Sequence, residues 1–118
     1  MADPIPLRRR PIHWDRLRAD EAERIIHERA KNSDHVIVIG HPAERIEERS
    51  ILRPELDRIL RTGMVMEQPR KVAEALGRWV WEAVIVKRLK GGRDAAAVTI
   101  ILREDRLIIK TVQWMDER

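Results

Sequence analysis

Apolar residues recur with a helical period at the start of the folded part of the chain. Asp20 stands where a helix-capping residue is expected, and Glu23 follows three positions later, as in a capping box. The apolar stripe of this predicted helix consists of Ala22, Ile25, Ile26 and Ala30. We expect the helix to end within 31–34. The run His-Val-Ile-Val-Ile at 35–39 then predicts a short buried strand.

Two prolines predict two further helices. Pro42 suits the first turn of a helix that runs to about Arg49. Pro54 has the same place in the next predicted helix, and Gly63 is a natural C-terminal stop for it. The apolar stripe of that helix consists of Leu56, Ile59 and Leu60.

Beyond residue 63 the period changes to that of strands. The predicted strands are 64–67, 78–89, 95–102 and 107–114. Turn signals at 90–93 and 103–105 connect the last three as an antiparallel meander. Residues 68–77 are predicted to be a loop, with a helix over 72–76 as the alternative. The order of elements predicts an α+β fold, with a small antiparallel sheet of four to five strands and two to three helices packed on one face.

The length of 118 residues fits one domain, which can bury a core without a metal or disulfide. Residues 1–17 hold three prolines around Arg8, Arg9 and Arg10, so they predict a flexible basic arm before a domain at 18–118. That arm is either a disordered tail or a partner-binding segment. Because the chain has four tryptophans but no phenylalanine and no tyrosine, its core must be mainly aliphatic.

Composition excludes several classes of protein. The absence of cysteine excludes thiolate catalysis, disulfides and cysteine metal sites. The four histidines are scattered without ligand spacing, and the glycines at 91–92 belong to a turn, so neither a metal nor a nucleotide cofactor is expected. No apolar run approaches the ~20 residues of a membrane span, and no secretory signal is present. We therefore expect a cytoplasmic protein.

Positive charge is concentrated in the first residues of the chain. Residues 1–18 contain five arginines and two aspartates, a net charge of +3. Residues 19–118 contain 19 basic and 18 acidic side chains, a net charge of +1. A nearly balanced body with a basic arm predicts only a modest, salt-sensitive attraction to phosphates.

His41, Arg45 and Arg49 stand at i, i+4 and i+8, so a helix places them along one stripe. This stripe is separate from the core-facing one of the same helix. An imidazole beside two guanidiniums suits a phosphate-bearing ligand, because arginine matches phosphate oxygens and histidine exchanges protons near neutrality. Alternatively, the arginines are solvated or paired with glutamates of the same helix, and His41 merely caps it.

Residues 22–112 resemble the Domain of Unknown Function 4258 family of small bacterial proteins. The most specific part is His-Pro-Ala-Glu-Arg-Ile-Glu-Glu-Arg-Ser-Ile at 41–51, which is similar to that family's H-A-x-E-R-M-x-E-R-G-I. Similar stretches are the spacer at 58–67, Gly-Arg-Trp at 77–79 and Ile-Ile-Lys-Thr-Val at 108–112. Such proteins look related to RelE-like and BrnT-like toxins of toxin–antitoxin pairs.

The resemblance implies a RelE-like fold and an endoribonuclease that acts on mRNA, free or ribosome-associated, and is blocked by a cognate antitoxin. In the implied site Arg45 and Arg49 bind the scissile phosphate, His41 acts as acid or base, and Lys110 adds charge. Further expected nucleic-acid contacts are Arg8, Arg9, Arg10 and Arg78. The chain has Gln113 where the family has tyrosine, so no mechanism that needs a C-terminal phenol is available. The alternative is a non-catalytic nucleic-acid- or protein-binding module that uses the same basic residues.

Other candidates leave two interpretations open. Trp79 and Trp81 share one face of a strand and either join the core or stack on bases. Lys110, within an apolar strand, either points into a site on the sheet face or guards an edge strand. His35 is expected to be structural. His13, with Trp14, anchors the arm to a partner or to the domain itself.

Overall fold

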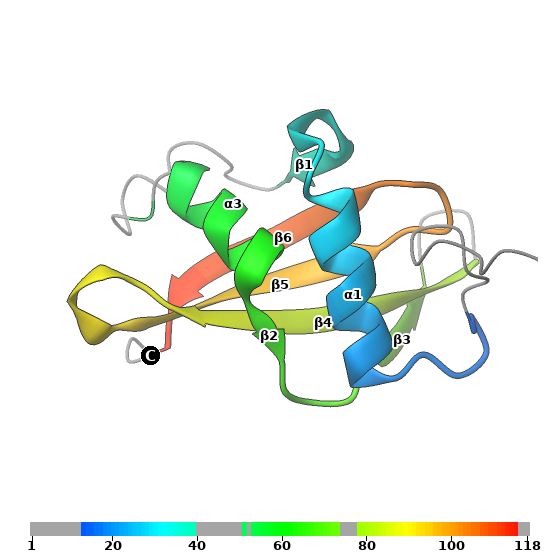
Figure 1. Cartoon of the computed structure of the whole chain (residues 1–118). Coiled ribbons are helices and arrows are strands. Elements are labelled where there is room, and N and C mark those ends of the chain that lie inside the picture. Colours follow the sequence, from blue (N-terminus) through cyan, green and yellow to red (C-terminus); the bar gives the residue numbers. More distant parts are fainter. Residues whose placement is uncertain (1–12, 40–50, 52, 74–77, 116–118) are drawn as a thin grey trace, which may run out of the picture.

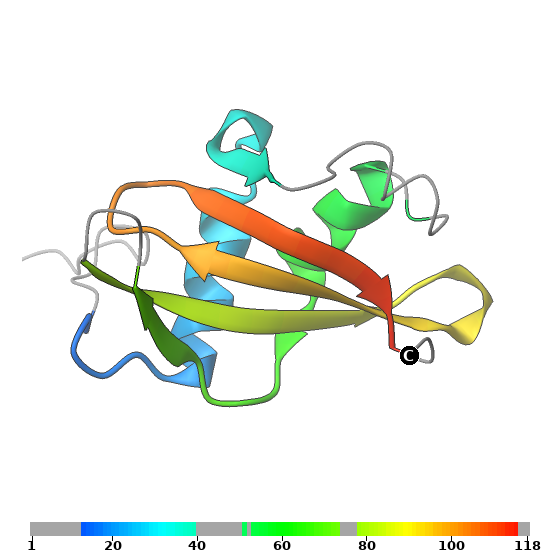
Figure 2. The same ribbon diagram turned by 180° about the vertical axis from the view of Figure 1, so that it is seen from behind.

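A six-stranded sheet with two α-helices on one face forms the part of the chain that the computed structural model describes, residues 13–39, 51, 53–73 and 78–115 (Figures 1 and 2). The helical elements are α1 (Ala19–Arg29), α3 (Arg53–Thr62) and the 3-10 turns η2 (Ser33–His35) and η3 (Lys90–Gly92). The strands are β1 (Val36–Val38), β2 (Met64–Val65), β3 (Arg70–Ala73), β4 (Trp79–Arg88), β5 (Asp94–Ile101) and β6 (Leu107–Trp114). The predicted α+β class is confirmed.

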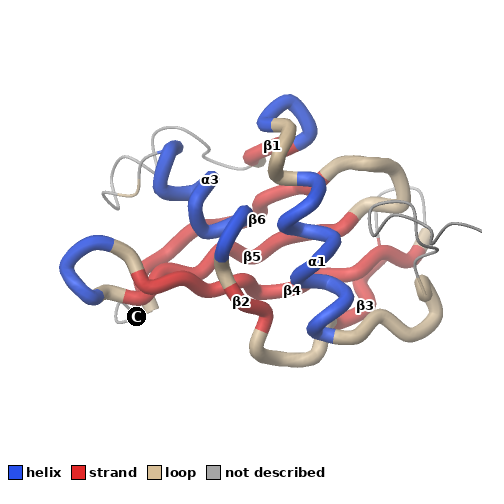
Figure 3. The backbone as a smooth tube through the Cα atoms, viewed as in Figure 1, coloured by secondary structure: helices blue, strands red, loops and turns tan. Residues whose placement is uncertain are grey.

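The strand order is β1-β6-β5-β4-β2, and β3 also pairs with β4 (Figure 3). The meander of β4, β5 and β6 is antiparallel, as predicted. The sheet as a whole is mixed, because β1 runs parallel to β6, with Val36 opposite Leu107. The prediction of a purely antiparallel sheet of four to five strands was therefore wrong. The sequence of a strand of three β-branched residues does not indicate whether its partner runs parallel or antiparallel to it. That direction depends on which edge strand of the sheet it pairs with, here β6.

Residues 70–73 form a strand, where the sequence predicted a loop. Lys71 of β3 lies opposite Trp81 of β4, and Val72 lies opposite Val80. β3 has only one half-buried residue, Val72, so its sequence shows no apolar alternation. Pairing with a long neighbouring strand, rather than a pattern of its own, makes this segment a strand. The part of the predicted loop at 74–77 lies outside the described residues.

The core lies between the helices and the sheet face that they cover. Leu56, Ile59 and Leu60 of α3 are fully buried, as predicted. Of the stripe predicted for the first helix, Ala22, Ile26 and the C-cap residue Ala30 are fully buried, and Ile25 is partly buried against the same core. Leu17, assigned to the arm by the sequence, is also fully buried in this core. Within the described residues, neither helix is long and apolar enough to cross a membrane.

The start of α1 differs from the predicted capping box. The helix begins at Ala19 with Arg18 as its N-cap residue, and no side chain caps it. Asp20 lies in the first turn instead. The Glu23 carboxylate accepts a hydrogen bond from the Val65 backbone N–H at 2.9 Å, so it holds β2 rather than the helix terminus. A long-range partner has replaced the local one.

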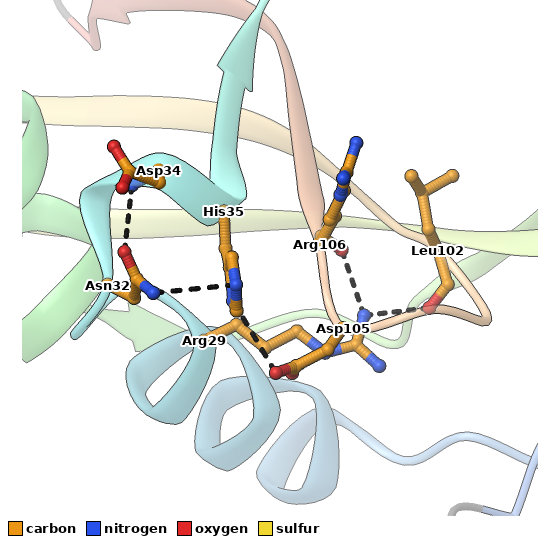
Figure 4. A network of polar contacts seen from close by, with 7 residues as sticks. All are labelled: Arg29, Asn32, Asp34, His35, Leu102, Asp105 and Arg106. Carbon is orange, nitrogen blue, oxygen red and sulfur yellow. Dashed lines mark hydrogen bonds and ion pairs between the residues drawn. The ribbon is translucent and has the colours of Figure 1, made fainter.

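A buried arginine fastens the β5–β6 turn to the end of α1 (Figure 4). The Arg29 guanidinium donates to the carbonyl oxygens of Leu102 at 2.7 Å and Arg106 at 2.9 Å. Its Nε lies 3.4 Å from Asp105, which also lies 3.4 Å from Nδ1 of His35. These contacts give His35 the structural place that the sequence predicted for it.

Candidate functional site on the open sheet face

Strand alternation separates the two faces of the sheet. Trp81, Ala83 and Ile85 of β4 point into the core beneath α1 and α3, so the residues between them point the other way. We call this second side the open face, because no helix of the described chain covers it (Figure 2). A small apolar cluster lies on it, made of Val80, Ile100 and Leu102 with Val72 and Ile108.

A nearly buried carboxylate lies on the open face between two cations. Glu82 of β4 is only 6% exposed. Its Oε1 accepts a hydrogen bond from Arg70 Nη2 at 2.6 Å, and its Oε2 accepts one from Lys110 Nζ at 3.0 Å. The two cations come from β3 and β6, on either side of Glu82 in the sheet. We refer to Glu82, Arg70 and Lys110 as the Glu82 cluster.

A β-bulge in β6 aims Lys110 at this cluster. Thr99 lies opposite Ile109, while the preceding residue Val98 lies opposite Thr111. Lys110 is therefore the extra residue and has no partner of its own in β5. Ile109 is fully buried on the core side, so Lys110 next to it faces the open side. From there its chain reaches across β5 to the carboxylate on β4.

The charge state of Glu82 follows from two opposing effects. Burial by itself raises the pKa of Glu82. Hydrogen bonds from Arg70 and Lys110, together with their positive charges, outweigh burial and leave the pKa below the ordinary value of a glutamate. The carboxylate is therefore ionised at neutral pH.

The Glu82 cluster combines a base with spare hydrogen-bond donors. The Arg70 and Lys110 side chains are 73% and 49% exposed, whereas the Glu82 side chain is only 6% exposed. A guanidinium carries five N–H donors and an ammonium three, and each uses one on Glu82 here. The remaining donors can bind phosphate oxygens beside a carboxylate that can accept a proton.

The predicted site residues fall into three groups. Lys110 lies on the sheet face, the first of the two places considered for it. Arg78 is exposed just before β4 and shares the side of Glu82 by alternation. The predicted ladder and the arginines of the arm lie outside the described residues: His41, Arg45, Arg49, Arg8, Arg9 and Arg10.

Sequence reasoning missed Glu82 and Arg70. The available signal for Glu82 was the same as for Lys110, a charged residue in the middle of an otherwise apolar strand. Two such residues of opposite charge in one sheet could have been predicted to meet. Arg70 carried no signal, because its segment was not recognised as a strand.

The two tryptophans of β4 differ in exposure. Trp81 is buried in the core, the first of the two alternatives considered for it, but Trp79 is exposed. The Trp14 carbonyl accepts the Trp81 indole N–H at 2.7 Å, and His13 lies 2.9 Å from Glu21. Both anchors hold residues 13–17 to the domain itself.

Among the described residues, no group of three or more His, Asp or Glu side chains is placed to hold a metal ion. Comparison of the chain with protein families, with curated proteins and with solved structures finds no match. The Glu82 cluster therefore carries the functional interpretation on its chemistry alone.

Proposed function

We propose that this chain is a metal-independent endoribonuclease and the toxin of a toxin–antitoxin pair, which cuts RNA on the open face of its sheet. The observation that carries the proposal is the ionised carboxylate of Glu82 between the donors of Arg70 and Lys110. A base next to cations is what cleavage of RNA by its own 2′-hydroxyl requires.

The reaction is an internal transfer of the phosphodiester. Glu82 takes the proton of the 2′-hydroxyl, whose oxygen forms a bond to the neighbouring phosphorus. Arg70 and Lys110 stabilise the negative charge that builds up on the phosphate oxygens. The bond from phosphorus to the 5′-oxygen breaks, and an acid gives that oxygen a proton. The products are a 2′,3′-cyclic phosphate and a 5′-hydroxyl.

The resemblance assigns the acid and further phosphate contacts to the ladder. His41 would protonate the leaving oxygen, and Arg45 and Arg49 would bind the scissile phosphate. These roles stay predictions. The proposal gives the base to Glu82, which frees His41 for the role of the acid and needs no tyrosine.

The test is cleavage of a labelled RNA oligonucleotide by the purified full-length chain. We expect Glu82→Gln to slow cleavage by about 100-fold or more, since a positioned base contributes on that scale, and Lys110→Ala to slow it similarly. Arg88→Ala is the matched control. It removes an exposed cation from the far end of β4, the strand of Glu82, on the same face of the sheet. The wild-type products should carry cyclic phosphate ends, and a 2′-deoxy residue at the cut should block the reaction.

Folded wild-type protein that leaves RNA intact would overturn the proposal, as would a Glu82→Gln variant that cuts at the wild-type rate. Growth provides the second test. Expression of the chain alone should arrest growth, and a protein encoded beside it should bind the chain and restore growth.

A non-catalytic RNA-binding module is the second candidate. It is favoured by the engagement of both cations with Glu82. Under this reading, Lys110→Ala weakens RNA binding and there is no turnover to lose. The appearance of cyclic phosphate ends separates the two candidates.

A further inference from the structure

The first strand residue of β4 presents an indole ring to solvent. Trp79 is 57% exposed, whereas Trp81 and Trp114 are buried and Trp14 is half-buried. The chain has these four tryptophans and neither phenylalanine nor tyrosine. The one mostly exposed indole ring therefore lies at the start of a central strand.

The contacts that hold Trp79 in place are made by its backbone and not by its ring. Its carbonyl oxygen accepts a hydrogen bond from Arg103 Nε at 3.2 Å, and β3 pairs with it through Ala73. The Arg103 guanidinium also lies 5.2 Å from the ring centre of Trp14. The strand start, the β5–β6 turn and the segment before α1 are thereby joined into one support. The backbone that carries the Trp79 ring is therefore held by contacts within the domain.

Two exposed cations lie near the start of β4, one on β3 and one in the β5–β6 turn. Lys71 lies opposite Trp81, so alternation places it on the same side as Trp79, and its Nζ lies 5.5 Å from the Trp81 ring centre. Arg103 is exposed as well. In the same turn, Asp105 is engaged by Arg29 and His35, whereas Glu104 is exposed. An aromatic face beside cations complements a base that is attached to phosphates.

We propose that Trp79, with Arg103 and Lys71, forms a subsite that stacks one unpaired base of single-stranded RNA and binds the phosphates next to it. The inference rests on the proposed function, because it takes RNA as the ligand. Trp79 precedes Glu82 by three residues, which is about 10 Å along the strand at the usual rise, and strand alternation places its ring on the opposite side of the sheet from Glu82. A single strand that passes around the end of β4 would reach both sites. A duplex has no free base face to offer.

The test measures binding separately from cleavage. The probe is a fluorescein-labelled 2′-O-methyl RNA hexamer, which lacks the attacking hydroxyl, and its binding to the full-length chain is followed by anisotropy. We expect Trp79→Ala to weaken binding about tenfold or more, in line with the loss of one stacked base, and Trp79→Phe to restore most of it. Met66→Ala is the matched control, since Met66 is another exposed apolar residue on a different part of the domain.

The hexamer with one abasic position should lose affinity for wild type but not for Trp79→Ala. A duplex of the same sequence should bind weakly to both. The subsite is overturned if Trp79→Ala binds the hexamer like wild type, or if the duplex binds as tightly as the single strand. Thermal unfolding of Trp79→Ala shows whether a loss of binding comes from a loss of the fold. If Trp79→Ala is unfolded, binding of the hexamer by Trp79→Phe tests the subsite instead.

The outcome is distinguishable from that of the proposed function. If the Glu82 site does not cut RNA, the 2′-O-methyl hexamer still reports stacking on Trp79. If stacking is absent, natural RNA still reports cleavage at Glu82.

Discussion

At the scale of single residues, the tertiary structure explains why a charged residue, Glu82, stands in the middle of an apolar strand. An isolated carboxylate on a sheet face at 6% exposure would be costly. Two charge-assisted hydrogen bonds, one from each side, offset that cost. Removing either cation leaves the carboxylate partly unpaired, so we expect the loss of either one to destabilise the sheet.

The cluster predicts a pH dependence of stability. Because the pKa of Glu82 is lower in the folded chain than its ordinary value of 4.5, the unfolded chain takes up this proton first as the pH falls. The contribution of Glu82 is therefore fully present above about pH 4.5 and is lost below it. We expect the free energy of unfolding to fall more steeply below pH 4.5 in wild type than in Glu82→Gln. Arg70→Ala should lie between the two.

Urea unfolding at pH 6, 4.5 and 3.5 measures this difference. Parallel curves for wild type and Glu82→Gln over that range would show that the two cations do not hold the carboxylate in its charged form.

At the scale of elements, α3 approaches the sheet closely at its C-terminal end. A Cβ atom on Gly63 would contact the Ile59 carbonyl oxygen and lie 2.8 Å from the Val86 carbonyl oxygen. Gly63 has no positive φ angle, so the need for glycine here comes from this close approach and not from a left-handed turn. The Gly63 carbonyl in turn accepts a hydrogen bond from His27 Nε2 at 2.7 Å, which ties α1 to the same point.

Gly63→Ala should therefore destabilise the domain. Backbone oxygens cannot move aside as a flexible side chain can, and overpacking of this kind costs about 3 kcal/mol at the upper end of its usual range. Gly91→Ala is the control, since Gly91 has a φ of 84° but no atom near its missing Cβ. That variant should lose only about 1 kcal/mol from its left-handed backbone. Urea unfolding decides, and equal losses in both variants would contradict the packing explanation.

At the scale of the whole molecule, charge is local rather than global. The body of the chain from residue 19 carries a net charge of only +1. Long-range attraction to RNA is therefore weak, and affinity must come from a few cations at defined places. Among the residues that the structure describes, the two proposed sites contain four such cations: Arg70, Lys110, Lys71 and Arg103.

The salt dependence of RNA binding tests this distribution. If these four residues make three to four phosphate contacts, they should contribute about −2 to −3 to the slope of log K against log salt concentration for a single strand. Lys71→Ala should reduce the magnitude of the slope by about 0.7, whereas Arg88→Ala, which also removes one positive charge, should leave it unchanged. Anisotropy titrations from 50 to 300 mM salt, as rough limits, measure both slopes. Equal effects of the two variants would mean that net charge alone attracts RNA.

Local pattern predicted the elements that carry their own signal. α3 lies where Pro54, its apolar stripe and Gly63 placed it, and the meander follows its turn signals. β3 was missed, since a short strand whose side chains are mostly exposed has no apolar alternation. At α1, Glu23 was assigned to a local cap because a sequence shows neighbours at three residues and not the partner at Val65.

The site divides in the same way. From the sequence alone came Lys110 as a charged residue out of place in an apolar strand, and alternation placed it on one face with Ile108 and Val112. Only the tertiary structure revealed the bulge, after which Val112 turns into the core while Lys110 stays on the open face. Only the structure joined Lys110 to Glu82, because that contact spans 28 residues of chain and the intervening strand β5. Periodicity is a local property of the backbone, whereas register, strand direction and ion pairing depend on which strands meet.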